Sequence, residues 1–222
     1  MGLSDSLRKR ADGVWRRILE HPFVGGIGDG SLSRDRFTFF LRQDYLFLIE
    51  YSRVLAMAAA KAPDLAGMTR FSEVLHATMS QEMELHRRYS AGFGISPEEL
   101  ERTRIAPGTS AYGRYLVSIA HEGSIKEIVA AVLPCEWGYS EIGRHLAATG
   151  NASDENPYAE WINTYASDEF SALGAWLRGY LDEQARGCSA AERRRLHEVF
   201  LTSSRYEYLF WEMAYNKERW PV

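Results

Sequence analysis

The chain has only two cysteines, Cys135 and Cys188, and no Cys-x-x-Cys spacing. Neither a disulfide framework nor a structural zinc site is therefore expected, and a reducing, cytoplasmic compartment fits best. No run of about 18 apolar residues occurs, so no membrane-spanning helix is predicted. Residues 1–20 mix Arg and Lys with apolar residues and hold no continuous apolar stretch, so no secretory signal peptide is predicted either.

Strong positive charge is also missing. The formal net charge is −4, and the one short run of arginines, at 193–195, falls in a helical pattern that is typical of a solvated face. Nucleic acid is therefore not an expected partner.

Helical periodicity dominates what is present. No segment alternates apolar and polar residues for long, and 222 residues with 45% apolar content suit one domain covering 1–222. Long helices joined by short loops predict an all-α, single-domain bundle. The expected helices cover 4–20, 33–62, 64–91, a short segment after 96, 109–123, 124–149 with a kink at Pro134, 156–166, 167–186 and 189–216. The glycine-rich stretch 25–30 is expected to be a loop.

Aromatic residues are plentiful, with 12 Tyr, 10 Phe and 6 Trp. Core packing accounts for most of them. A buried tyrosine hydroxyl needs a hydrogen-bond partner, so many inward tyrosines indicate a polar-lined pocket inside the bundle.

Cys135 is the first candidate for chemistry. It follows Pro134, which distorts a helix and opens space beside it. Tyr139 lies one turn later on the same face. The alternative is a buried, inert cysteine, which is the commoner case. Cys188 stands at a helix boundary and is expected to be a bystander.

Asp44 is the second candidate, because it lies inside a strongly apolar helix with Phe47 and Tyr51 on the same side. A carboxylate in apolar surroundings is costly unless it is paired, and it acts as a base or a ligand anchor at many sites. The alternative is a structural ion pair with Arg42 or Arg53.

Glu207 is the third candidate. Tyr206 and Tyr208 flank it, and Phe210 and Trp211 follow on its side of the helix. So many aromatic neighbours are unusual for a solvated glutamate, although a surface glutamate is the alternative.

Two Glu-x-x-x-His pairs, Glu82/His86 and Glu141/His145, have a spacing that metal sites in helical bundles use. A di-iron site needs further inward carboxylates, and His197 has no acid at that spacing. The favoured interpretation is therefore that both Glu–His pairs are exposed on the surface and bind no metal.

His21 is a weak candidate for an axial haem ligand. It precedes Pro22 at a helix end, where a cap or loop role is more common.

Four segments together resemble the TenA/thiaminase II family of the haem-oxygenase-like superfamily. They are His-Pro-Phe-Val at 21–24 with the glycines at 26–30, Gln-Asp at 43–44, Leu-Pro-Cys at 133–135, and the aromatic stretch 203–215. The resemblance covers about 14–220, and the motifs occur in the family's order.

This resemblance implies a TenA-type helical bundle, assembled as a homotetramer, without metal or organic cofactor. It implies a hydrolase that acts beside an aminopyrimidine ring in thiamin salvage. The substrate is then thiamin or an aminomethyl pyrimidine, and the product is hydroxymethyl pyrimidine.

The resemblance also implies roles for single residues. Cys135 matches the nucleophile, Glu207 the acid that protonates the ring nitrogen, and Asp44 the carboxylate that binds the exocyclic amine and assists the cysteine. Phe47 departs from a tyrosine found in some members, which puts substrate preference in question. The remaining expected pocket residues are Tyr112, Tyr139, Tyr165 and Phe210.

Two alternatives stay open at the level of sequence. One is a metal-dependent oxidase on the same bundle, built on the two Glu–His pairs. The other is a regulatory protein that binds a pyrimidine without turnover.

Overall fold

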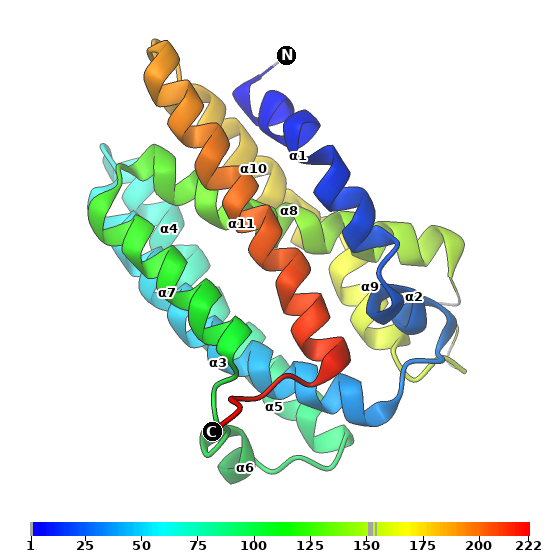
Figure 1. Ribbon diagram of the computed structural model, residues 1–222. Helices are drawn as coiled ribbons and strands as arrows, with labels where there is room; N and C mark the ends of the chain where they lie inside the picture. Colours follow the sequence, from blue (N-terminus) through cyan, green and yellow to red (C-terminus); the bar gives the residue numbers. More distant parts are fainter. Residues whose placement is uncertain (1, 151–152, 154) are drawn as a thin grey trace. The chain divides into compact units, whose positions relative to one another are not determined.

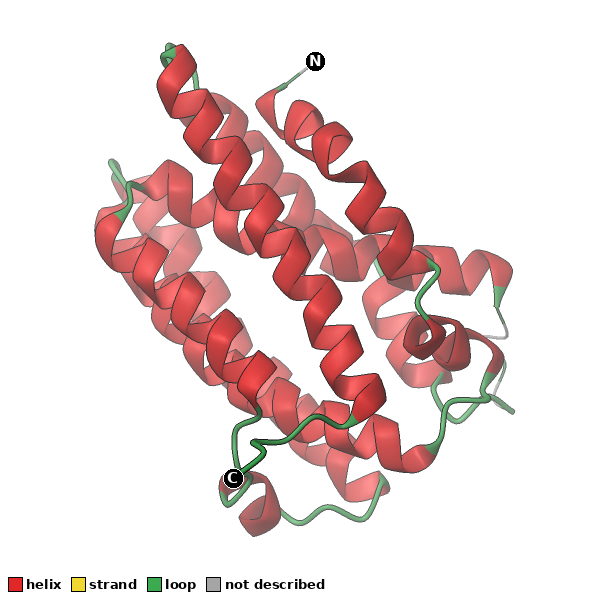
Figure 2. Ribbon diagram, viewed as in Figure 1, coloured by secondary structure: helices red, strands yellow, loops and turns green. Residues whose placement is uncertain are grey.

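The computed structural model describes residues 2–150, 153 and 155–222, and every regular element within them is a helix (Figures 1 and 2). The all-α prediction is therefore confirmed for this part of the chain. None of the helices described combines the length and the apolar character that crossing a membrane requires. The chain divides into two compact units. Unit 1 comprises Met1–Ser33 and Val129–Tyr215, and unit 2 comprises Arg34–Ile128 and Asn216–Val222.

Unit 1 is built from helices of both chain ends. In it α1 packs against α2 and α10, and α10 packs against α9. Its core includes Trp15, Phe23, Phe200 and Trp211, all almost fully buried. Its helices are α1 (Leu3–Leu19), α2 (Pro22–Asp29), most of α8 (Ile125–Thr149), α9 (Ala159–Ala166), α10 (Asp168–Gln184) and nearly all of α11 (Ala190–Asn216).

Unit 2 is organised around one long helix, α3, which packs against α4, α5 and α7. Phe37, Phe40, Val54, Phe71 and Leu116 are completely buried in it. Its helices are α3 (Arg34–Lys61), α4 (Leu65–Ala77), the π-helical turn η1 (Thr78–Glu82), α5 (Met83–Gly92), α6 (Pro97–Glu101), α7 (Pro107–Glu122) and the first turn of α8.

Several helix starts follow from capping residues that are visible in the sequence. Before α11, Ser189 N donates to Glu192 Oε2 at 2.9 Å, and Glu192 N donates to Ser189 Oγ at 3.2 Å. Ser96 and Glu99 form the same reciprocal pair before α6. Each pair satisfies two backbone N–H groups that have no partner inside the helix. The predicted starts of these two helices are confirmed.

The expected loop at 25–30 is wrong, because this stretch belongs to α2. The side chain of His21 accepts a hydrogen bond from Phe23 N, Pro22 occupies the first turn, and Gly30 ends the helix at φ 78°. A glycine inside a helix costs about 1 kcal/mol relative to alanine. Complete burial of Phe23, Val24 and Ile27 offsets that cost.

The helix expected over 64–91 is interrupted. It forms α4 and α5, with the π-helical turn η1 between them. Hydrophobic periodicity does not distinguish one π turn from a continuous α-helix, so the sequence gives no sign of it. Two other starts also differ from expectation. Helix α7 begins at Pro107 rather than 109, since proline suits the first helical position, and α9 begins at Ala159 rather than 156.

Close packing of α8 on α9 gives a stability prediction. A Cβ at Gly143 would lie 2.6 Å from Ala166 N and 2.8 Å from Tyr165 O, which are backbone atoms that cannot rotate away. We expect Gly143→Ala to lower the free energy of unfolding by about 1–3 kcal/mol in urea titrations. The control is Gly179→Ala on α10, where nothing lies within 4 Å of the added Cβ. This variant should gain about 0.5–1 kcal/mol. Equal effects of the two substitutions would contradict the packing argument.

Candidate active site

Cys135 lies on α8 directly after Pro134 and is half-buried. One turn earlier on the same helix, Ala131 O accepts a hydrogen bond from Ser203 Oγ of α11. Ser203 in turn precedes Glu207 by one turn. This bond joins α8 and α11 one turn before each of the two candidate residues, and thereby fixes the two helices against each other.

Glu207 is buried, with 5% of its surface exposed, so the surface interpretation of this residue is wrong. It lines a cavity of about 10 Å³, roughly the space of one water molecule. Pro134 also lines this cavity. The cavity is far smaller than the roughly 300–1,000 Å³ of a ligand pocket. The full lining is Trp15, Ile18, Leu19, Pro134, Gly138, Glu141, Ile142, Glu207 and Trp211.

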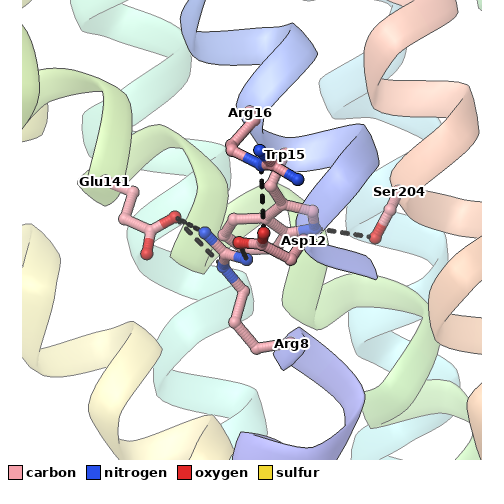
Figure 3. A network of polar contacts seen from close by, with 6 residues as sticks. All are labelled: Arg8, Asp12, Trp15, Arg16, Glu141 and Ser204. Atoms are coloured by element: carbon pink, nitrogen blue, oxygen red, sulfur yellow. Dashed lines mark hydrogen bonds and ion pairs between the residues drawn. The ribbon is translucent and has the colours of Figure 1, made fainter. Parts of the chain in front are cut away.

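A polar network holds the α1 side of this cavity (Figure 3). Trp15 Nε1 donates to Ser204 Oγ at 3.0 Å, and the Arg8 guanidinium lies 4.3 Å from the centre of the Trp15 ring. Arg8 also forms an ion pair with Glu141 of α8 at 3.0 Å. These contacts tie α1 to α8 and α11, and they fix the orientation of the indole beside Glu207.

An aromatic cluster in unit 1 shares Trp211 with the lining of this cavity. The ring centres of Tyr139 and Tyr165 are 5.0 Å apart, those of Trp161 and Tyr165 are 4.6 Å apart, and those of Tyr139 and Trp211 are 5.3 Å apart. Two of the predicted pocket tyrosines are therefore neighbours. Phe210, the predicted pocket wall of α11, is 3% exposed.

Asp44 belongs to unit 2, and its partner is a histidine. His86 Nε2 of α5 lies 3.1 Å from Asp44 Oδ2, and both side chains are nearly completely buried. The expected alternative partners are engaged elsewhere, because Arg42 pairs with Glu99 and Arg53 pairs with Glu50. The interpretation of Asp44 as an Asp–Arg pair is therefore wrong.

Two other predicted pocket residues lie near each other in unit 2. The rings of Phe47 and Tyr112 stack with their centres 4.9 Å apart. Gln43 positions α7, which carries Tyr112. Its Oε1 accepts from Ala106 N at 2.8 Å and from Thr109 Oγ1 at 2.9 Å. Its Nε2 donates to a backbone carbonyl at 3.0 Å, so this buried amide is well satisfied.

The predicted residues thus form two groups, one in each unit. Cys135, Tyr139, Tyr165, Glu207 and Phe210 belong to unit 1, whereas Asp44, Phe47 and Tyr112 belong to unit 2.

The two Glu–His pairs have different environments. His145 is exposed as expected, and Glu141 pairs with Arg8. His86 is buried against Asp44, so the expectation of an exposed Glu82–His86 pair is wrong. Sequence reasoning missed His86 as the partner of Asp44. Within the described residues, no group of three or more His, Cys, Asp or Glu side chains is placed to hold a metal ion.

His21 is a helix cap, as favoured from its position. Its Nδ1 accepts from Phe23 N at 3.1 Å, and its Nε2 lies 3.6 Å from Glu212 Oε1. Tyr208 donates to the same Glu212 oxygen at 2.8 Å. Burial lowers the pKa of His21 below its ordinary value, although Glu212 opposes that shift.

This pKa predicts an acid-sensitive contribution to stability. The unfolded chain binds a proton at His21 at a higher pH than the folded chain does. The free energy of unfolding therefore falls as pH drops below about 6.5. We expect a shallower fall in His21→Asn, since asparagine caps a helix without titrating. Urea unfolding between pH 5 and 8 measures this, and identical slopes for variant and wild type would contradict it.

Comparison with known proteins supports the family resemblance. The model of the TENA/THI-4/PQQC family matches residues 8–217. A protein of Halalkalibacterium halodurans named aminopyrimidine aminohydrolase is 49% identical over 220 residues, which are 99% of this chain and 98% of that protein.

Solved structures agree at the level of fold. The TenA homologue of P. horikoshii superimposes with a TM-score of 0.91 at 30% identity, covering 97% of this chain and 99% of that one. A Shewanella denitrificans domain with a heme oxygenase-like fold gives a TM-score of 0.74 at 14% identity, covering 96% and 92%. This second likeness concerns the fold alone, and it confirms the predicted haem-oxygenase-like architecture. By its match over nearly the whole length, the chain belongs to the TENA/THI-4/PQQC family.

Proposed function

We propose that this protein is an aminopyrimidine aminohydrolase that acts in thiamin salvage. The observation that carries the proposal is the 49% identity to a protein of that name over almost the full length of both chains. The half-buried Cys135 and the buried Glu207 on two joined helices of unit 1 supply a nucleophile and an acid for such a reaction. Residues 1–222 act as one functional domain in this proposal.

The chemistry assigns a separate task to each of these two residues. A neutral pyrimidine is a poor electrophile, and protonation of a ring nitrogen by Glu207 makes it accept electrons. The Cys135 thiolate adds to the ring, and the leaving group departs as ammonia from an aminomethyl pyrimidine or as the thiazole from thiamin. Water then replaces the cysteine, which leaves as thiolate, and the product is hydroxymethyl pyrimidine. The net reaction consumes one water and releases one ammonia from aminomethyl pyrimidine or one thiazole from thiamin.

Asp44 and the aromatic residues have a binding task. Following the family resemblance, Asp44 accepts a hydrogen bond from the exocyclic amine and assists Cys135 in losing its proton. A free thiol has a pKa of about 8.5, so such assistance is useful near neutral pH. Tyr112, Tyr139, Tyr165, Phe47 and Phe210 contact the flat ring. Phe47 offers no hydroxyl, so specificity at that position rests on stacking alone.

A cytoplasmic homotetramer is the proposed assembly. Leu65, Met68 and Met79 are 76%, 43% and 59% exposed, and such apolar surface is typical of an interface. Light scattering should give four times the chain mass of 25.3 kDa. Leu65→Lys combined with Met68→Lys should give a smaller species if these residues contribute to assembly. An unchanged tetramer would place the interface elsewhere, and a monomeric wild type would exclude the assembly.

The test of the activity compares two substrates. The wild-type protein is incubated with thiamin and, separately, with aminomethyl pyrimidine, and products are identified by mass. Hydroxymethyl pyrimidine from either supports the proposal, and the faster substrate identifies the salvage role. Binding of a pyrimidine without any release by the folded protein would favour the binding-protein alternative.

A further inference from the structure

The pair of Asp44 and His86 is a buried contact that the reaction as described leaves unexplained. The exposed fractions of the two side chains are 6% and 5%, and the atoms Asp44 Oδ2 and His86 Nε2 are 3.1 Å apart. A buried carboxylate without a partner costs several kcal/mol, so this contact offsets the cost of burying Asp44 inside unit 2. Among the side chains described, His86 is the one that pairs with it.

The fold turns His86 toward α3 by an irregularity in the helix that carries it. The π-helical turn η1 comes directly before α5. One extra residue in a turn rotates everything that follows by about 100° relative to a continuous α-helix. The face that α5 presents to α3 therefore depends on η1, and His86 lies on that face. π-helical turns inside α-helices are frequent at functional sites.

The electrostatics favour a charged histidine in this place. Burial lowers the pKa of His86, but the hydrogen bond and charge of Asp44 and the charge of Glu82 outweigh it, so the pKa is raised above its ordinary value. Asp44 of α3 and Glu82 of η1 are the carboxylates that raise this pKa. Its other nitrogen, Nδ1, has no hydrogen-bond partner among the described residues. The interaction of the imidazole is thus directed at Asp44.

We propose that His86 is a positioning residue for Asp44: it holds Oδ2 on the α5 side and leaves Oδ1 to accept from the exocyclic amine of the aminopyrimidine. This inference rests on the role given to Asp44 in the proposed function. His86 itself does not contact the reacting atoms. Its effect on turnover passes through the orientation of one carboxylate.

The experiment is a double-mutant cycle of His86→Leu and Asp44→Asn, assayed with aminomethyl pyrimidine for kcat and KM. We expect His86→Leu to lower kcat/KM by about 10- to 100-fold, by analogy with the loss seen when a partner that orients a metal-ligating side chain is removed. In the Asp44→Asn background the same change should cost less than about twofold, because the carboxylate that His86 orients is already lost. His76→Leu is the matched control, since His76 is exposed on α4 and should leave the rate unchanged.

A rescue variant separates positioning from general structural damage. The amide nitrogen of glutamine reaches the place of imidazole Nε2, whereas that of asparagine reaches only the place of Nδ1. His86→Gln should therefore recover most of the activity, and His86→Asn should not. This comparison decides the matter even if His86→Leu fails to fold, and melting temperatures are measured for all variants.

The outcomes distinguish this inference from the proposed function. Wild-type turnover in Asp44→Asn would remove the role of Asp44 and with it the proposed assignment. Impaired Asp44→Asn together with fully active His86→Leu would overturn the positioning role alone. Losses that multiply in the double variant, or equal activity of His86→Gln and His86→Asn, would overturn it as well.

Discussion

Replacing Cys135 by alanine is expected to lower kcat for aminomethyl pyrimidine by at least about a thousandfold. Removal of a covalent nucleophile leaves only binding and acid catalysis, which do not form the intermediate. Substrate binding should survive, because the lost sulfur contributes little to holding a ring that stacks on aromatic side chains. Stopped assays of product and calorimetric titration of the same variant measure the two quantities separately.

The control for this prediction is the second cysteine of the chain. Cys188 lies in the turn between α10 and α11, where its backbone N donates to Ala185 O at 3.2 Å. Cys188→Ala keeps that backbone bond and should retain full turnover. A Cys135→Ala variant that turns over within a few-fold of wild type would contradict the covalent mechanism. If the variant loses binding and turnover together, Cys135 is part of the binding surface instead.

Glu207→Gln is expected to lower kcat by about 100- to 10,000-fold, the usual contribution of a positioned general acid. Glutamine keeps the size of the buried side chain and can still form hydrogen bonds, but it has no proton to give. KM should therefore change much less than kcat. Steady-state kinetics over a range of substrate concentrations separate the two effects.

Glu198→Gln is the matched control, since Glu198 is an exposed residue of the same helix α11. Its kinetics should equal those of the wild type. A Glu207→Gln variant with a kcat within about twofold of wild type would show that another group protonates the ring. A rise in KM at unchanged kcat would instead make Glu207 a binding residue.

Much of the fold follows from local features of the sequence. The Ser96–Glu99 and Ser189–Glu192 pairs cap their helices as their spacing predicts. Helix α2 could not be predicted from local features, because tertiary burial of three apolar side chains outweighs the local cost of its glycines. The π-helical turn η1 could not be predicted either, since the same apolar positions fit a continuous α-helix.

The candidate site could be predicted from the sequence only in part. Cys135 and Glu207 stand out from their own neighbours in the chain, a proline for one and aromatic rings for the other. The partner of Asp44 does not stand out, because His86 reaches it only through the packing of α5 on α3 and the rotation that η1 introduces. The sequence suggests Arg42 or Arg53 as the partner of Asp44, but both arginines form ion pairs elsewhere. Local sequence patterns do not predict which distant segments come into contact.

The most direct test of the proposed activity is turnover of aminomethyl pyrimidine in water enriched in oxygen-18. Hydrolysis predicts hydroxymethyl pyrimidine that is two mass units heavier, with one ammonia released for each product molecule. No release by the folded protein, or a product whose oxygen comes from dissolved dioxygen, would contradict the account.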